Sequence, residues 1–206
     1  MKLILASNNK NKLREFSQLV KDMDIELIGQ RDAGCDFEVE ETGTTFEENS
    51  YLKASAVTEA TGIAAFADDS GLVVDALGGE PGVYSARYCP KPGATDEDRY
   101  NYLLSKLENT EKRSARFVCT ICCTMPNGDI IRTRGECEGY ILRSPVGTGG
   151  FGYDPVFHPN CVDKGMAELT PEEKNAISHR GKALREFIQK LDEYMNNMEK
   201  ENADNK

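Results

Sequence analysis

Two adjacent carboxylates are the residues of this chain best suited to chemistry on a charged substrate. Asp68 and Asp69 follow the apolar run 63–67 and precede Ser70 and Gly71. The run is typical of a short buried strand, so the acids are expected where a strand of an α/β sheet gives way to a loop. Because side chains alternate along a strand, the two carboxylates should point in different directions and do different jobs.

Metal-assisted attack on a phosphate is the chemistry that this pattern suits. A carboxylate can hold Mg²⁺ or can orient and deprotonate a water molecule, and Ser70 adds a hydrogen-bond donor. The alternative is a polar turn that only ends a strand, since aspartate, serine and glycine dominate turns. The motif alone leaves both interpretations open.

Three further groups of residues are compatible with a phosphate substrate. Ser7-Asn8-Asn9-Lys10-Asn11-Lys12 combines polar side chains and lysines with the start of a predicted helix, which suits phosphate oxygens. Glu40 and Glu41 are candidates for a further metal ligand, although acidic pairs in loops are more often simply solvated. Lys53, on the next predicted helix, is a candidate to reach a phosphate or a site acid, although surface lysines are commoner.

A glycine-rich loop near residue 150 presents aromatic side chains. Phe151-Gly152-Tyr153-Asp154 overlaps a stretch with four glycines between 147 and 152, so the backbone can approach a ligand closely. An aromatic ring here either stacks on a nucleobase or fills the core beneath a tight loop. Later in the sequence, Lys174 and Ser178-His179-Arg180 supply hydrogen-bond donors.

Composition limits the classes of protein to which the chain can belong. With 206 residues we expect a single domain over 1–206, with two lobes and a frayed tail from about residue 200. A net charge of −10 argues against broad electrostatic binding to nucleic acid, which requires a basic face. A few focused lysines and arginines can still bind a small anionic substrate.

Cysteine usage and hydropathy predict a cytoplasmic protein with reduced thiols and no membrane partner. The seven cysteines are an odd number without a disulfide framework, and no signal peptide opens the chain. No apolar run approaches the roughly 20 residues that a membrane-spanning helix needs. Cys119, Cys122 and Cys123 lack the further ligands of a zinc site and are better explained as strand residues.

Hydrophobic periodicity and turn signals predict an α/β fold with a mixed sheet. Asn127-Gly128 between two strand-like runs is a strong hairpin signal, so the sheet cannot be purely parallel. Thr45 with Glu48 and Thr170 with Glu173 resemble helix capping boxes. The expected strands are 2–6, 25–28, 63–67, 72–76, 116–124 and 129–138, and the expected helices are 10–20, 44–60, 95–107, a short helix after 170 and a last helix from about 181.

Taken together, these segments resemble the inosine triphosphate pyrophosphatases, also called the HAM1-like family of non-canonical purine nucleoside triphosphate pyrophosphatases. Their order and spacing cover nearly all of the chain up to the last helix. The matching segments are Ser7 to Lys12, Glu40 to Phe46, Ala67 to Leu72, Pro81 to Tyr88, Gly149 to Pro155 and Ser178 to Gly181.

The resemblance implies a Mg²⁺-dependent enzyme. Such an enzyme hydrolyses ITP, dITP or XTP to the monophosphate and pyrophosphate, and so keeps deaminated purines out of DNA and RNA. The implied fold is an elongated mixed β-sheet flanked by helices, in two lobes with the active-site cleft between them. Members of the family are usually homodimers.

The resemblance also implies roles for individual residues. Asp69 would be the proton acceptor and a metal ligand, with Asp68 beside it and Glu40 or Glu41 as the other metal carboxylate. The phosphate pocket would comprise Ser7, Asn8, Asn9, Lys10, Asn11, Lys12, Lys53 and Ser70. The base pocket would comprise Phe151, Gly152, Tyr153, Asp154, Lys174, His179 and Arg180.

Two other functions remain as alternatives at this stage. A broader nucleotide phosphatase would use the same metal and phosphate chemistry but release orthophosphate. A nucleotide-binding protein without turnover would require the loss of a metal carboxylate or a phosphate lysine. The chain has all of the candidates: Asp68, Asp69, Glu40, Glu41, Lys12 and Lys53.

Overall fold

The computed structural model describes residues 1–9, 12–13, 16–17, 20–21 and 23–204. The helix expected over 10–20 therefore falls largely outside the described residues. Within it, Lys12, Leu13, Phe16 and Ser17 are helical.

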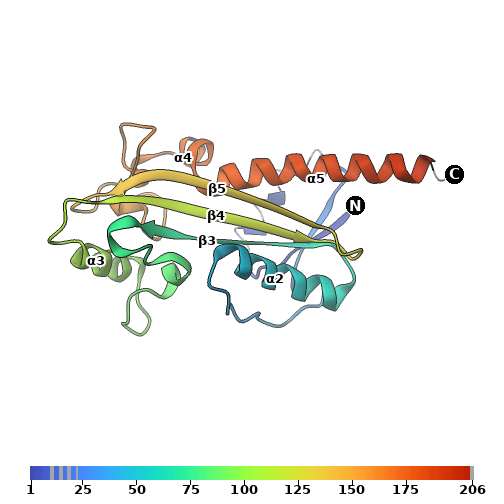
Figure 1. The fold of residues 1–206 in the computed structure, drawn as a ribbon, viewed down its shortest axis with the longest axis horizontal. Helices are drawn as coiled ribbons and strands as arrows, with labels where there is room; N and C mark the ends of the chain where they lie inside the picture. Colours follow the sequence, from blue (N-terminus) through green and yellow to red (C-terminus); the bar gives the residue numbers. More distant parts are fainter. Residues whose placement is uncertain (10–11, 14–15, 18–19, 22, 205–206) are drawn as a thin grey trace. The chain divides into compact units, whose positions relative to one another are not determined.

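A six-stranded sheet with the order β2-β1-β3-β4-β5-β6 forms the framework (Figure 1). β1 pairs in parallel with both β2 and β3, whereas β6 pairs antiparallel with β5, so the sheet is mixed as predicted. Helices flank it. The strands are β1 (Lys2–Leu5), β2 (Glu26–Gly29), β3 (Ala65–Val74), β4 (Ser114–Thr124), β5 (Ile130–Ile141) and β6 (Phe157–Pro159).

The helices that surround the sheet begin at polar caps. The side chains of Thr45, Thr95 and Thr170 each accept a hydrogen bond from the backbone N–H three residues on. The acidic side chain at that position accepts in return from the backbone N–H of the threonine. The capping boxes predicted at Thr45 and Thr170 are therefore confirmed. The α-helices are α2 (Phe46–Thr61), α3 (Asp96–Lys106), α4 (Pro171–Ile177) and α5 (His179–Asp204), and the 3₁₀ helices are η1 (Asp75–Leu77), η2 (Gly82–Arg87), η3 (Asp154–Val156) and η4 (Met166–Glu168).

The chain divides into two compact units, each built from separate stretches of sequence. The first unit comprises Met1–Asp69, Thr120–Thr133 and Ala183–Lys206. The second comprises Ser70–Cys119 and Arg134–Lys182.

In the first unit, α2 and the part of α5 from Ala183 onward cover opposite faces of the strands (Figure 1). Thr58 of α2 donates through its hydroxyl to the carbonyl of Thr124 in β4 at 3.1 Å. On the other face, the hydroxyl of Thr133 in β5 donates to the carbonyl of Ala183 at 3.0 Å. Both hydroxyls are satisfied by backbone carbonyls, so their burial carries no unpaired donor.

Aromatic packing joins β3 to helices in the first unit. The ring of Phe66 lies 4.8 Å from that of Phe16 and 5.0 Å from that of Phe187 in α5. All three side chains are buried, and each contributes about 1.5–3 kcal/mol by leaving water.

The last helix differs from the prediction at its end. The sequence predicted a frayed tail from about residue 200, whereas α5 continues to Asp204.

β3 differs from the prediction in one respect that matters for the acidic motif. The sequence suggested two strand segments with a loop at Asp68-Asp69-Ser70-Gly71, whereas the structure has one uninterrupted strand from Ala65 to Val74. Polar residues that dominate turns are tolerated here because cross-strand pairing and side-chain partners override local propensity. The acids thus lie in the middle of a strand.

The second unit has its own core between the sheet and α3. Leu72 and Val74 of β3 pack with Leu103 of α3, Phe117 of β4 and Phe157 of β6.

The cysteines of β4 are buried free thiols, which confirms their interpretation as strand residues. Within the described residues, no helix is both long enough and apolar enough to cross a membrane.

Gly139 provides a test of the packing of β6 on β5. A β-carbon added there would lie 2.3 Å from the carbonyl oxygen of His158 and 2.5 Å from the ring of Phe157. We expect Gly139→Ala to lower the free energy of unfolding by about 1–3 kcal/mol or more, because backbone and ring must both move. Chemical denaturation measures the change.

Gly165→Ala is the matched control for this substitution. A β-carbon at Gly165 would first meet the carboxylate end of Glu168, at 3.1 Å, and that flexible side chain can move aside. We expect a change below about 1 kcal/mol. Equal effects of the two substitutions would contradict the packing account.

Candidate active site

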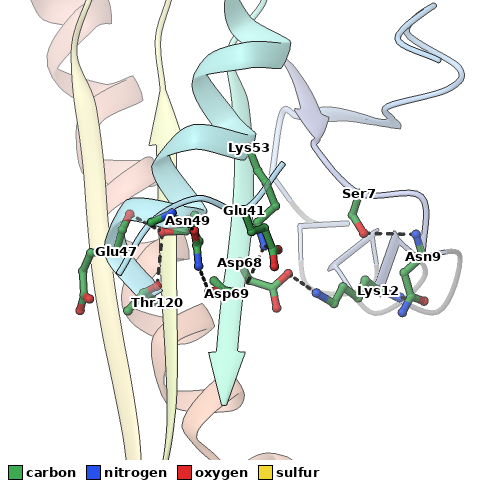
Figure 2. A network of polar contacts seen from close by, with 12 residues as sticks. Ser7, Asn9, Lys12, Glu41, Glu47, Asn49, Lys53, Asp68, Asp69 and Thr120 are labelled. Atoms are coloured by element: carbon green, nitrogen blue, oxygen red, sulfur yellow. Dashed lines mark hydrogen bonds and ion pairs between the residues drawn. The ribbon is translucent and has the colours of Figure 1, made fainter. Parts of the chain in front are cut away.

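The two consecutive aspartates of β3 form ion pairs with different lysines. Asp68 accepts a hydrogen bond from the ammonium of Lys12, with 2.6 Å between Oδ1 and Nζ. Asp69 contacts the ammonium of Lys53, with 3.3 Å between Oδ1 and Nζ. Figure 2 shows the two carboxylates pointing away from each other, as the alternation of a strand requires. The predicted difference in direction is therefore confirmed.

Lys12 is placed by the polar segment that follows β1. The backbone N–H of Asn9 donates to Ser7 Oγ at 3.2 Å, and the side-chain oxygen of Asn9 accepts from the backbone N–H of Lys12 at 3.3 Å. This is the bonding pattern of a helix N-cap. It sets the start of the turn from which the Lys12 side chain reaches Asp68 (Figure 2).

Lys53 connects two carboxylates. Its ammonium lies 2.7 Å from Oε1 of Glu41 and 3.3 Å from Oδ1 of Asp69. The other oxygen of Asp69 accepts from Nδ2 of Asn49 at 3.3 Å. Asn49 and Lys53 are four residues apart on α2 and so lie on the same face of the helix.

The backbone of Gly43 lies close to the side chain of Asn49, and this contact fixes the segment before α2 that carries Glu40 and Glu41, here called the acidic segment. The N–H of Gly43 donates to the side-chain oxygen of Asn49 at 2.8 Å. A β-carbon at Gly43 would lie 2.6 Å from that same oxygen, so only glycine fits without a shift. Asn49 is fully buried and thereby links the Gly43 backbone to Asp69.

Burial and neighbouring charges shift the pKa values of Asp69 and Lys53. Burial raises the pKa of Asp69 above its usual value, the nearby charge of Glu41 raises it further, and Lys53 and Asn49 act in the opposite direction. Burial alone would lower the pKa of Lys53, but the negative charges of Asp69, Glu41 and Asp68 outweigh it and raise that pKa. Lys53 therefore stays an ammonium at neutral pH.

The two glutamates of the acidic segment differ in position. Glu41 reaches Lys53, whereas Glu40 is exposed and its backbone carbonyl accepts from the N–H of Thr42 at 3.1 Å. Among the residues that the structure describes, no three or more histidine, cysteine, aspartate or glutamate side chains form a group that could hold a metal ion. The metal-ligand roles of Glu40, Glu41, Asp68 and Asp69 stay predictions.

The donor set of the first unit nevertheless has the chemistry that Mg²⁺ requires. Mg²⁺ prefers oxygen ligands and is usually bound by one or two carboxylates together with substrate phosphates and water. Asp68, Asp69 and Glu41 offer such carboxylates, each on or beside the same strand (Figure 2).

The residues expected to bind a base form a separate cluster within the second unit. Phe151 is 60% exposed. The ammonium of Lys174 lies 4.4 Å from the centre of the Phe151 ring and the guanidinium carbon of Arg180 lies 5.7 Å from it. An exposed aromatic ring can stack on a planar ligand, and the two cations that lie over this ring can donate hydrogen bonds to the ligand's edge.

The other predicted base-pocket residues have internal partners. Tyr153 is buried and donates through its hydroxyl to the carbonyl of Ser85 at 2.8 Å. Asp154 is buried, and its Oδ2 accepts from the N–H of Phe151 at 2.8 Å and from the ammonium of Lys174 at 2.5 Å. His179 is buried and stacks on Phe117 with ring centres 4.9 Å apart.

The remaining predicted phosphate residues divide into three cases. Lys10 and Asn11 lie outside the described residues. Asn8 is exposed in the loop after β1. Ser70 lies in β3, and its Oγ is buried with no hydrogen-bond partner among the described residues, so it is able to donate to a ligand.

Sequence reasoning missed Asn49 as a member of this site. The available signal was its spacing of four residues from Lys53, which places both side chains on one helical face. Asp96 of α3 was also missed, and it accepts from the N–H of Gly152 at 2.7 Å.

The chain matches a known family and is similar in sequence to known proteins. The model of the Ham1 family matches residues 3–190. A dITP/XTP pyrophosphatase of Geobacter sulfurreducens is 51% identical over 185 residues, which cover 89% of this chain and 92% of that protein. A dITP/XTP pyrophosphatase of Bacillus anthracis is 45% identical over 196 residues, covering 93% of this chain and 96% of that protein.

A solved structure supports the same assignment. The Ham1 protein from Coxiella burnetii superposes with a TM-score of 0.89 at 43% identity, covering 94% of this chain and 99% of that chain. Its similarity extends over nearly the whole length of both chains, as does that of the two pyrophosphatases. The chain therefore belongs to the Ham1 family.

Proposed function

We propose that this protein hydrolyses non-canonical purine nucleoside triphosphates, namely dITP, XTP and ITP, to the monophosphate and pyrophosphate. The observation that carries the proposal is the opposed pair on β3, in which Asp68 binds Lys12 and Asp69 binds Lys53 and Asn49. Buried acids next to lysines suit the handling of a polyphosphate and of an attacking water. The relatives' names specify the substrate class.

Asp69 is the proposed proton acceptor. Its raised pKa, caused mainly by burial, makes it a stronger base than an exposed aspartate. Lys53 and Asn49 hold both of its oxygens, which fixes the direction in which it can accept a proton. Attack of the oriented water at the α-phosphorus breaks the bond between the α-phosphorus and the bridging oxygen and releases pyrophosphate.

Lys12 and Lys53 have a second proposed role at the triphosphate. In the structure each ammonium neutralises a carboxylate, and a phosphate oxygen can share the same ammonium because lysine has three donors. The Ser70 hydroxyl is a further donor to the phosphates. Positive charge that is already in place stabilises the developing negative charge of the leaving group.

Mg²⁺ is the proposed cofactor, and one or two of the carboxylates of Asp68, Asp69 and Glu41 would hold it together with the substrate phosphates. The ion would supply charge neutralisation and Lewis-acid polarisation at the phosphates. Lys53 lies between Glu41 and Asp69, so it offsets their mutual repulsion and keeps both carboxylates in place.

Base selectivity is proposed to come from the cluster of Phe151, Lys174 and Arg180. The 6-keto oxygen of hypoxanthine or xanthine accepts a hydrogen bond, whereas adenine presents an amino group there. A donor such as Arg180 would be left unpaired by adenine, at a cost of about 1–3 kcal/mol if it is buried by the ligand. Phe151 would stack on the base.

The cellular role follows from this chemistry. Hydrolysis of deaminated purine triphosphates removes them before polymerases insert them into DNA or RNA. We propose that the protein acts in the cytoplasm without a nucleic-acid or membrane partner and, as the family resemblance implies, as a homodimer.

A product assay tests the proposed reaction directly. Purified protein with Mg²⁺ and ITP should yield IMP and pyrophosphate, with ATP and GTP nearly unchanged, as resolved by ion-exchange chromatography. Removal of Mg²⁺ with a chelator should abolish turnover. Orthophosphate as the product would instead indicate a broader phosphatase, and tight binding of ITP without hydrolysis would indicate a binding protein.

Asp69→Asn tests the proposed base. We expect the fold and nucleotide binding to be retained and kcat to fall by about 10²- to 10⁴-fold, because the amide cannot accept the proton. The control is Asp75→Asn, which removes a carboxylate beyond the end of β3 that pairs with Arg116. Unchanged turnover in Asp69→Asn would remove this residue from the catalytic role.

Arg180→Ala tests base readout. We expect the ratio of kcat/KM for ITP to that for ATP to fall about fivefold or more, since the lost donor distinguishes the two bases. Lys182→Ala is the control, because the ammonium of Lys182 donates to the carbonyl of Glu136 on β5. An equal loss on both nucleotides would show that Arg180 does not read the base.

A further inference from the structure

The loop that carries Phe151 is held by two carboxylates on consecutive backbone N–H groups. Asp154 accepts from the N–H of Phe151 at 2.8 Å, and Asp96 accepts from the N–H of Gly152 at 2.7 Å. Gly152 has φ +62, a conformation that glycine adopts freely. Hydrogen bonds from an amide to a carboxylate are among the stronger ones because the acceptor is charged.

The two carboxylates differ in origin. Asp154 belongs to the loop itself, and its Oδ2 also accepts from the ammonium of Lys174 in α4, at 2.5 Å. Asp96 is the first residue of α3 and is distant in sequence, so its bond to Gly152 anchors the loop to a helix. Thr95 and Asp98 form the capping box of α3, which leaves Asp96 outside the cap interactions.

Asp96 is itself oriented by a neighbour. Its Oδ1 lies 2.5 Å from Nη1 of Arg99, while its Oδ2 accepts from Gly152. The Nε of Arg99 donates to the carbonyl of Ala86 in η2 at 2.8 Å. Arg99 thereby sets the direction of the carboxylate, even though the Asp96 side chain is 50% exposed.

A second anchor lies on the other side of Gly152. The hydroxyl of Tyr153 donates to the carbonyl of Ser85, which also belongs to η2. The segment 152–153 is thus fixed at both residues, one through Asp96 and Arg99 and the other through Tyr153. Phe151 precedes this fixed segment and keeps its ring exposed.

We propose that Asp96 is a positioning residue that holds the loop presenting Phe151 and thereby prepares the surface on which the purine base binds. The base-binding part rests on the proposed function. Holding the ring before the ligand arrives lowers the entropy cost of binding. Loss of the anchor should therefore weaken substrate binding more than it slows the chemical step.

Amide hydrogen exchange tests the anchor without reference to activity. In Asp96→Ala, the segment 150–153 should exchange about tenfold faster than in the unaltered protein, while the strands of the second unit keep their protection. Glu97→Ala removes an equal charge from the same helical turn and should leave exchange unchanged. Unchanged exchange in Asp96→Ala, or a loss of protection throughout the unit, would overturn the proposal.

Kinetics with ITP tests the link to Phe151. Asp96→Ala should raise KM about threefold or more with kcat within about twofold, and Asp96→Asn, whose amide oxygen can still accept from Gly152, should recover most of the loss. In a Phe151→Ala background the Asp96 substitution should add little. Additive effects would show that Asp96 does not act through Phe151.

The two measurements separate the two proposals. If the unaltered protein does not hydrolyse ITP, the proposed function fails, while hydrogen exchange still decides whether Asp96 holds the loop. If ITP is hydrolysed but exchange is unaffected by Asp96→Ala, the positioning role alone fails.

Discussion

Charge neutralisation in the middle of β3 is the constraint on which the rest of the first unit depends. Two consecutive carboxylates in a continuous strand point to opposite sides, so one cation cannot serve both. Asp68 is 99% buried by side chain and is matched by Lys12, whereas Asp69 is matched by Lys53. Removing one partner of a buried pair costs about 3–5 kcal/mol, so each lysine must be held in place.

Two helix starts meet this requirement in different ways. On one side, Asn9 caps the turn that carries Lys12. On the other, the capping box of Thr45 and Glu48 begins α2, and the helix then places Asn49 and Lys53 on one face toward Asp69. The local hydrogen bonds of the two helix caps thus determine where the ammonium groups of Lys12 and Lys53 lie. The geometry of the site therefore depends more on secondary structure than on long loops.

The sequence was informative where a local rule applied. The capping boxes and the Asn127-Gly128 hairpin depend on residues a few positions apart, and the structure has all of them. The course of β3 through Asp68 to Gly71 could not be predicted in this way, because partners distant in sequence override the turn preference of these residues. The contact of Lys53 with Glu41, and not with Glu40, is likewise revealed by no local pattern.

The second unit shows how similar residues acquire different roles from burial alone. Phe151 and Tyr153 are two residues apart in one glycine-rich loop, and the sequence left open whether an aromatic ring there stacks on a ligand or fills the core. Tyr153 is buried because its hydroxyl finds the carbonyl of Ser85, which removes the penalty for an internal polar group. Phe151 has no such polar group to satisfy, and the carboxylates that hold the loop bind backbone N–H groups, so the Phe151 side chain stays exposed.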